Sequence, residues 1–417
     1  MKSKYNIIRK IGNKGYLIFN TLHQNLVFIN KCDYEDFEKE TKTNPNYPEW
    51  INEGLLGNNL ENEYFDKYQQ VYSKKDKKRQ VLTIFTTTAC NARCAYCFEQ
   101  GIKTMSMDLK NIEKLSQAII NSINSDWLHI TWFGGEPLLF ANTIDKLTQD
   151  IKTYCENNNI KYTASIITNG SLINDDIKQK MHSKWNIVST QITLDGLAKK
   201  YNKIKAYVDN SDFEKVINNI KLIASKKHKV TIRINFDKHN LTNCLKLVKF
   251  LYKNDLKSDK VFIYFSPITT TKGNDKSKKL INNQYKKIFK VLIKYNYLKN
   301  LQYFNFYLAE HHCQAEQPNS YCLFPNGIVT KCQRQKPQIS NISIYDDNFL
   351  NKLNNDWQNY ENSKQNAKCQ DCISLPLCKG GCKINDFSKL TKNHCDRCFV
   401  YSDAFDAVLF ALQKIYL

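Results

Sequence analysis

Short apolar runs and longer amphipathic stretches alternate along the chain from about residue 81. The apolar runs have the length of buried strands, and the stretches between them carry apolar residues at helical spacing. Strands that alternate with helices of this length indicate right-handed crossovers and a parallel sheet. The chain is therefore predicted to be of the α/β class, with an open, partial (β/α)6 barrel. Its strands are expected at 81–88, 127–133, 162–170, 187–196, 229–235 and 260–268, and its helices near 108–124, 141–156, 175–183, 212–226 and 241–253.

The pattern changes at both ends of this barrel segment. Near the N-terminus, YLIFN and LVFIN are separated by TLHQN, which indicates a hairpin, and a helix is expected at 33–41. After the barrel, a break at 271–279 precedes a helix near 282–296, and a closing amphipathic helix is expected at 401–417. We expect four parts: a small α+β accessory domain, the barrel, a bridging segment and an irregular cysteine-rich domain, at 1–78, 79–270, 271–308 and 309–417.

Composition narrows the class of protein. The chain has 417 residues, 42% of them hydrophobic, which suits two or three globular domains. No apolar run approaches the roughly 18 to 20 residues of a membrane helix, and the N-terminus lacks the apolar stretch of a signal peptide. We therefore expect a cytoplasmic protein with no membrane partner.

The net charge of +21 has two interpretations. It could serve an anionic partner, such as nucleic acid or an acidic peptide. However, the lysines are scattered over every segment, and Asn, Ile and Tyr are abundant too, as low-G+C coding produces. The compositional interpretation is the stronger one, so we do not expect nucleic acid as a partner.

Fifteen cysteines are unusual for a reducing compartment, where disulfides do not persist. Twelve of them fall within 90–97 and 313–398, and such clusters indicate metal binding. Cys32, Cys155 and Cys244 stand alone and are expected to be buried structural thiols.

The first cysteine group reads TACNARCAYCFEQG and contains Cys90, Cys94 and Cys97, spaced C-x3-C-x2-C directly after the first strand. Three thiolates can hold three irons of a four-iron, four-sulfur cluster and leave the fourth iron open to an external ligand. A three-cysteine zinc site is the alternative. The next strand ends in FGGEP, in which two glycines permit close backbone approach and Glu136 suits an ammonium group.

These motifs together resemble the radical S-adenosylmethionine (SAM) enzymes. The resemblance implies that the amino and carboxylate groups of SAM chelate the open iron, and that cleavage yields a 5′-deoxyadenosyl radical that abstracts a hydrogen atom. It places Tyr96 near the adenine and the GGEP motif at the SAM amino group. The same comparison assigns SAM contacts at Gly134, Gly135, Glu136 and Pro137, at Thr168 and Asn169 in TNG, at Thr193 and Asp195 in TLDG, and at Arg233 and Asn235. We identify no further catalytic residue, and expect Glu99 to be a local hydrogen-bonding residue.

One segment departs from the family pattern. After the DG of the fourth strand, many relatives carry a Pro, a His–Asp pair and an Arg. Here those places hold Leu197, Tyr201, Asn202 and Lys205. The contacts on the substrate side are therefore not given by the resemblance.

The second cysteine group resembles the SPASM domain that follows many radical SAM barrels. It contains C-x2-C-x5-C-x3-C, and in its full form the domain binds two auxiliary four-iron clusters. The resemblance gives auxiliary cluster I the ligands Cys313, Cys322, Cys332 and Cys382, and auxiliary cluster II the ligands Cys369, Cys372, Cys378 and either Cys395 or Cys398. Complete ligand sets imply roles in electron transfer and structure. A pair of zinc sites is the alternative, although zinc ribbons favour paired C-x2-C motifs.

The resemblance implies three 4Fe-4S clusters, SAM, an external electron donor such as a flavodoxin or ferredoxin, and a peptide substrate. The favoured hypothesis is oxidative modification of a ribosomally made precursor peptide, which gives a thioether, carbon–carbon or carbon–oxygen crosslink. The N-terminal segment is then either a recognition domain for an acidic leader or a scaffold cap. A formylglycine maturase of sulfatases is a second hypothesis, but Gln333 follows Cys332 where those enzymes carry an Asp. A non-catalytic zinc or nucleic-acid-binding protein is the third.

Overall fold

The computed structural model describes residues 1–57, 79–268, 275–299, 313–362, 373, 376 and 403–416. Contacts between residues divide the chain into two compact units. The first comprises Met1–Lys75, Asn300–His311 and Glu361–Leu417, and the second comprises Asp76–Lys299 and His312–Tyr360.

The second unit is built on an eight-stranded sheet whose order is β11-β10-β4-β5-β6-β7-β8-β9. Neighbouring strands from β4 to β9 pair in parallel, as the alternation of strands and helices predicts. The strands are β4 (Arg79–Thr87), β5 (Trp127–Gly134), β6 (Lys161–Thr168), β7 (Ile187–Thr193), β8 (Val230–Phe236), β9 (Val261–Pro267), β10 (Tyr321–Leu323) and β11 (Val329–Thr330).

Helices follow the strands of this sheet. They are α4 (Ile112–Asn121), α5 (Ala141–Asn157), α6 (Asp175–Ser183), α7 (Ala198–Lys205), α8 (Phe213–Ile223), α9 (Leu241–Lys253), α10 (Asp275–Lys294) and α11 (Phe349–Asn362). Two of them begin at a residue whose side chain caps them: Asn174 accepts from the Ile177 amide before α6, and Asp212 from the Lys215 amide before α8. Two other helices differ from the prediction. Helix α10 begins inside the expected break at 271–279, and α7 was not predicted. Within the described part of the chain, every helix is too short or too polar to cross a bilayer.

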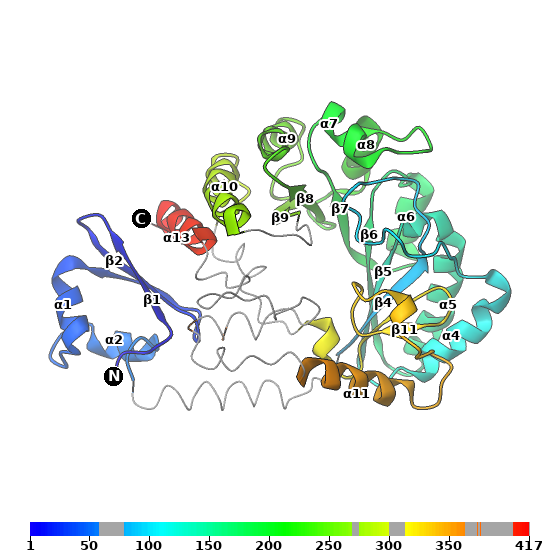
Figure 1. Ribbon diagram of the computed structural model, residues 1–417, viewed down its shortest axis with the longest axis horizontal. Helices are drawn as coiled ribbons and strands as arrows, with labels where there is room; N and C mark the ends of the chain where they lie inside the picture. Colours follow the sequence, from blue (N-terminus) through cyan, green and yellow to red (C-terminus); the bar gives the residue numbers. More distant parts are fainter. Residues whose placement is uncertain are drawn as a thin grey trace. The chain divides into compact units, whose positions relative to one another are not determined.

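The two faces of the sheet have different chemistry. On β5, Leu128, Ile130 and Trp132 have no exposed surface and share one face of the sheet, because side chains alternate along a strand. Helices α4, α5 and α6 cover one face of this sheet (Figure 1). The alternate side chains point to the other face, where His129 is hydrogen-bonded through Nδ1 to Thr163 Oγ1 at 2.9 Å and through Nε2 to Ser165 Oγ at 3.1 Å. The inner face of the barrel is therefore polar at this level.

Two strands from beyond residue 309 extend the barrel sheet. β10 pairs in parallel with β4, with Cys322 opposite Thr83, and β11 pairs antiparallel with β10. Gln80, which is fully buried, donates to the carbonyl oxygens of Ser122 at 3.0 Å and Asn319 at 2.9 Å. This first stretch of the expected cysteine-rich domain therefore belongs to the same compact unit as the barrel.

The first unit contains a three-stranded antiparallel sheet of order β1-β2-β3. The predicted hairpin is present, and one further strand precedes it. Ile18, Phe37, Trp50 and Leu55 form much of its core. Its elements are β1 (Asn6–Ile11), β2 (Gly15–Asn20), β3 (Leu26–Asn30), α1 (Lys31–Lys39), α2 (Tyr47–Asn52) and α13 (Asp403–Tyr416).

The three isolated cysteines divide between surface and core. Cys155 and Cys244 are fully buried, as expected. The expectation for Cys32 is wrong, because this residue is exposed. It stands at the second position of α1, a helix whose buried residue is Phe37.

Candidate active site

The three clustered cysteines occupy the loop that leaves β4 at its C-terminal end. Cys90, Cys94 and Cys97 are all partly buried. Burial, together with the neighbouring Glu136, Cys94 and Cys97, raises the pKa of the Cys90 thiol to about 11. Burial also raises the pKa of Cys97. Without metal the thiols of Cys90 and Cys97 are protonated, so metal binding must release their protons.

The spacing of the thiols bears on which metal they suit. Among the residues that the structure describes, no three His, Cys, Asp or Glu side chains lie together as the ligands of a single ion would. A four-iron cluster asks for something different, since each thiolate binds its own iron at a separate corner of the cube. Cys90, Cys94 and Cys97 lie on one short loop and can supply these three thiolates.

The glycines of the FGGEP motif allow two backbone segments to touch. A Cβ on Gly134, whose φ is +127°, would lie 2.0 Å from the Thr87 carbonyl oxygen, and one on Gly135 would lie 2.2 Å from that of Ala89. The Gly135 amide donates to Thr87 O at 3.1 Å, and the Glu136 amide donates to Ala89 O at 2.9 Å. Only residues without a Cβ fit here, so the end of β5 is held against the chain that enters the cysteine loop.

Glu136 joins the end of β5 to the end of β6. Its side chain is fully buried, and Oε1 accepts from Thr168 Oγ1 at 2.7 Å while Oε2 accepts from the Asn169 amide at 2.7 Å. Oε1 also accepts from the Leu138 amide at 3.1 Å. Burial raises the pKa of Glu136 to about 7, although these hydrogen bonds act in the opposite direction. Each carboxylate oxygen can accept more than one hydrogen bond, so the predicted role toward an ammonium group remains available.

A chain of amides connects β6 to the cysteine loop. Asn169 Nδ2 donates to Asn91 Oδ1 at 2.7 Å and lies 4.0 Å from Cys90 Sγ. Asn91 Nδ2 in turn donates to Ser171 Oγ at 2.8 Å and to Asp209 Oδ2 at 2.6 Å. Sequence reasoning missed Asn91 and Asp209. The available signal was the position of Asn91 directly after Cys90.

Asp195 gathers residues from three elements. Its Oδ1 accepts from the Asn235 amide at 2.9 Å, and its Oδ2 accepts from the Tyr96 hydroxyl. Lys205 Nζ lies 3.4 Å from the same Oδ2. The structure therefore brings together Tyr96, Asp195 and Asn235, which the sequence predicted from separate motifs. It adds Lys205, one of the positions at which the chain departs from the family pattern.

The remaining predicted SAM contacts lie at the same end of the sheet. Arg233 donates through Nε to Asn235 Oδ1 at 2.9 Å and through Nη2 to Ser266 Oγ at 3.1 Å. Thr193 is its partner on the adjacent strand. Pro137 follows Glu136 and begins a short 3-10 turn, and its carbonyl oxygen accepts from Thr86 Oγ1 at 3.3 Å. Arg233 therefore already has two protein partners, and its role toward SAM stays a prediction.

Glu99 differs from expectation. In the described structure its Oε2 is buried and has no hydrogen-bond partner, and burial raises its pKa to about 7. The expectation of a local hydrogen-bonding residue is therefore wrong for this oxygen.

The second cysteine group is described only in part. Cys322 is fully buried on β10, Cys332 is partly buried, and Cys313 is exposed. Burial raises the pKa of Cys322, and the nearby Cys332 adds to the effect. Cys322 packs with three phenylalanines, Phe85, Phe133 and Phe324. The other proposed ligands lie outside the described residues: Cys369, Cys372, Cys378, Cys382, Cys395 and Cys398.

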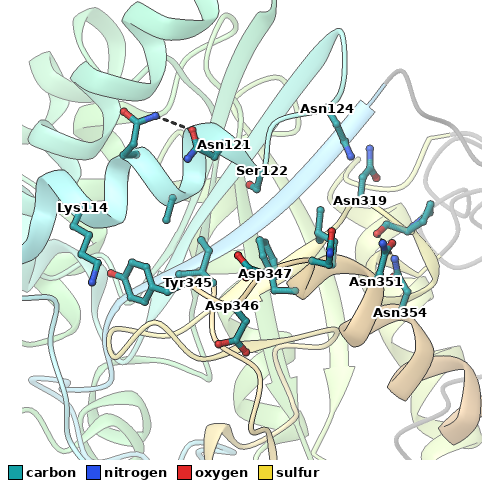
Figure 2. Close-up of a pocket in the computed structure, with 17 residues that line it drawn as sticks. Lys114, Asn121, Ser122, Asn124, Asn319, Tyr345, Asp346, Asp347, Asn351 and Asn354 are labelled. Carbon is teal, nitrogen blue, oxygen red and sulfur yellow. Dashed lines mark hydrogen bonds between the residues drawn. The ribbon is translucent and has the colours of Figure 1, made fainter.

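A cavity of about 990 Å³ lies elsewhere, along α4 and the segment that leads into α11 (Figure 2). Its lining includes Asn124, shortly before β5, and Asn319, shortly before β10. These positions mark the N-terminal ends of the strands, opposite the end that carries the cysteine loop. The cavity is therefore separate from the candidate active site.

Comparison with known families identifies the barrel. The profile of the radical SAM superfamily matches residues 84–251. Those residues form a radical SAM domain. The match includes the cysteine loop, the FGGEP motif and Asp195, which are the parts that the structure assembles into one site.

Two relatives illustrate the similarity of the chain to known proteins. A cysteine-type anaerobic sulfatase-maturating enzyme of Clostridium novyi is 25% identical over 71% of this chain and 85% of that protein. The radical SAM cyclopropyl synthase TigE of Paramaledivibacter caminithermalis is 25% identical over 43% of this chain and 41% of that protein.

Two solved structures share the fold. One is anSMEcpe with bound AdoMet and the Kp18Cys peptide, which has a TM-score of 0.64, 20% identity, and coverage of 81% of this chain and 99% of that one. The other is Streptococcus suis SuiB bound to precursor peptide SuiA, with a TM-score of 0.53, 14% identity, and coverage of 92% and 95%.

The chain thus contains a radical SAM domain, and the superfamily implies a 4Fe-4S cluster and SAM as cofactors. The residues present fit that requirement. Cys90, Cys94 and Cys97 offer three thiols, and the glycine contacts at Gly134 and Gly135 leave the backbone bare beside them.

Proposed function

We propose that this radical SAM enzyme oxidatively modifies a ribosomally made peptide and that a SPASM-type pair of auxiliary clusters serves the reaction. The observation that carries the proposal is the pairing of β10 with β4. It places Cys322 opposite Thr83 and against Phe85 and Phe133, on the barrel wall itself. A cysteine of the second group is thereby built into the same sheet that presents the SAM-cluster loop. This arrangement suits an oxidation in which electrons leave the substrate toward a second metal site.

The residues of the radical SAM domain have separable tasks. When bound, the cluster and SAM supply abstraction of a hydrogen atom from an unactivated carbon. Cys90, Cys94 and Cys97 would hold three of the irons, and Glu136 fixes the strand ends beside them through its three hydrogen bonds. On the other face of β5 from Leu128, Ile130 and Trp132, His129 is hydrogen-bonded through both ring nitrogens to β6 and so helps to hold these two strands together.

The first unit offers a surface for a peptide. Its sheet has the order β1-β2-β3, so β1 and β3 are both edge strands of that sheet. Phe28, on β3, is exposed to 37%. An extended peptide can bind by adding a strand to such an edge, with pockets for alternate side chains. We propose that this sheet binds the leader of the precursor, and that the excess of lysines favours an acidic leader.

A formylglycine maturase of sulfatases is the second candidate. The similarity to the Clostridium novyi enzyme, over 85% of that protein's length, favours it. Gln333 weighs against it, because the family resemblance places an Asp proton acceptor directly after Cys332. An amide cannot accept a proton as a carboxylate does.

The experiment that tests the proposal is anaerobic co-expression with the short open reading frame beside the gene, followed by intact mass of the small peptide. We expect a loss of two hydrogen atoms per event. The Cys94→Ala variant should give no loss, because the SAM cluster lacks a ligand. Cys372→Ala should still cleave SAM but form no product, and should hold about four fewer irons than the roughly twelve of three clusters.

Two results would redirect the proposal. An unchanged peptide, from an enzyme that cleaves SAM in its presence, would exclude that peptide as substrate. Conversion of a cysteine-containing sulfatase-motif peptide to formylglycine would favour the second candidate.

A further inference from the structure

Lys205 is a buried lysine at the end of α7. Its exposed fraction is 4%, although the other lysines of this helix reach solvent to a greater extent. The next residue, Ala206, adopts the left-handed conformation and ends the helix. A buried ammonium group is costly unless it is paired and hydrogen-bonded, so its surroundings should explain its presence.

The ammonium group faces the middle of the cysteine loop. Lys205 Nζ lies 3.4 Å from Asp195 Oδ2 and donates to the Tyr96 hydroxyl at 3.2 Å. It also lies 5.8 Å from the ring centres of Tyr96 and Tyr201. Tyr96 lies between Cys94 and Cys97 in the sequence, so Lys205 is hydrogen-bonded to the segment that carries two of the three thiols.

The backbone of the same region holds the start of the loop. The Lys205 carbonyl oxygen accepts from the Arg93 amide at 2.8 Å, and Cys94 Sγ lies 4.0 Å from it. Three residues later, the Val208 amide donates to the Asn91 carbonyl oxygen at 2.9 Å. Lys205 and the segment that follows α7 therefore hold both halves of the loop. The Lys205 side chain binds Tyr96, and backbone hydrogen bonds at Lys205 and Val208 hold Arg93 and Asn91.

The charges within this group compensate one another. Burial alone would lower the pKa of Lys205, but Asp195, Tyr96 and Cys94 outweigh that effect and raise it above its usual range. Asp195 is itself fully buried and accepts from the Asn235 amide on β8 through its other oxygen. Lys205 is thus connected, through Asp195, to the strand on the far side of the site.

We propose that the Lys205–Asp195 pair is a positioning device that holds Tyr96 and the cysteine loop in the shape that binds the SAM cluster and SAM. Lys205 acts through Tyr96 and Arg93, so it is a positioning residue. The proposal concerns the SAM site alone and does not depend on which peptide the enzyme modifies.

The test compares the full-length, anaerobically reconstituted enzyme with the variants Lys205→Met, Lys205→Arg and Asp195→Asn/Lys205→Met. The readouts are SAM affinity and the change that SAM causes in the EPR spectrum of the reduced enzyme, since complete auxiliary clusters have no open iron for SAM. Lys203→Met is the matched control, because Lys203 is an exposed lysine on the same helix.

We expect Lys205→Met to lose the SAM-induced spectral change and to bind SAM at least about tenfold more weakly, or 1.4 kcal/mol. Lys205→Arg should keep both properties, because a guanidinium can bridge the same two oxygens. Lys203→Met should match the unmodified enzyme.

The double variant separates positioning from folding. Removal of Lys205 alone leaves an unpaired buried carboxylate, which destabilises a protein strongly, whereas removal of both charges can be nearly neutral. We expect the double variant to resist urea as the unmodified enzyme does and still to bind SAM weakly. Normal SAM affinity and spectra in either Lys205→Met or the double variant would overturn the proposal.

Discussion

Single carboxylates and amides, each with several partners, hold the loops of the candidate active site. Glu136 is the clearest case, because one fully buried side chain accepts from Leu138, Thr168 and Asn169. Asp195 does the same for Tyr96 and Asn235. Residues of this kind bring the strand ends into one site.

Replacement of Glu136 should therefore damage both stability and SAM binding. Glu136→Ala leaves three donors without an acceptor, and each such loss costs about 1–3 kcal/mol. Glu136→Gln keeps a carbonyl acceptor, so its stability and its SAM affinity should lie between those of the unmodified enzyme and those of Glu136→Ala. Urea unfolding and equilibrium binding of SAM measure the effects, with Glu113→Ala, at an exposed carboxylate of α4, as control. Unchanged SAM binding in Glu136→Ala would contradict this assignment.

His129 should make the free energy of unfolding depend on pH. Burial and then the charge of Arg79 lower the pKa of His129 from 6.5 to about 4. Between these values the unfolded chain binds the proton and the folded chain does not, so acid favours unfolding. As the pH falls from about 6.5 to 4, this residue should remove roughly 2–3 kcal/mol from the free energy of unfolding.

Urea unfolding at a series of pH values measures that loss. His129→Gln should make the free energy of unfolding less dependent on pH over the same interval, whereas His239→Gln, an exposed histidine, should leave the dependence as it is. A pH dependence that is identical in all three proteins would mean that the pKa of His129 is the same in the folded and the unfolded chain.

At the scale of elements, the join between β4 and β10 is the feature on which the proposed chemistry depends. Gln80 reaches across it, with its side chain bonded to Ser122 and Asn319. Thr83 Oγ1 adds a hydrogen bond to Gln314 Oε1 at 2.9 Å. The join is therefore fixed by side chains as well as by the short ladder of the strands.

Gln80→Leu tests this join. The change keeps much of the volume but leaves two buried carbonyl oxygens short of a donor, so we expect a loss of about 1–3 kcal/mol in stability. Urea unfolding measures it, and Gln117→Leu, on the exposed side of α4, is the control. Equal stability of the two variants would show that the join does not need this amide.

The sequence predicted the six parallel strands because each is an apolar run bounded by polar turns, and it placed the cysteines and FGGEP by their spacing. It missed α7, because the residues that this helix buries are Tyr201 and a lysine, Lys205, which a hydrophobic pattern does not register. It also missed β10 and β11, since strands of three and two residues have no periodicity of their own. Asn91 and Asp209 meet only through the fold, so spacing alone does not reveal them.

At the scale of the molecule, the chain does not fold domain by domain along its length. Each compact unit is assembled from separated stretches, and the radical SAM unit takes both Asp76–Lys299 and His312–Tyr360. The N-terminal sheet likewise shares its unit with the C-terminal helix α13. The two units therefore alternate along the sequence. Truncation at the N-terminus or at the C-terminus removes part of the first unit, which contains residues from both ends of the chain.

This order of the units along the sequence has a consequence during synthesis on the ribosome. Gln80 and Asn319 are 239 residues apart, so at about 5–20 residues per second the nascent chain carries β4 for on the order of tens of seconds before β10 exists. Throughout that time one edge of β4 presents unpaired amides and carbonyls, which are a template for pairing with another chain. A chain that ends before residue 321 would contain a barrel with this edge open. A chain that extends beyond residue 323 can pair the same edge with its own β10.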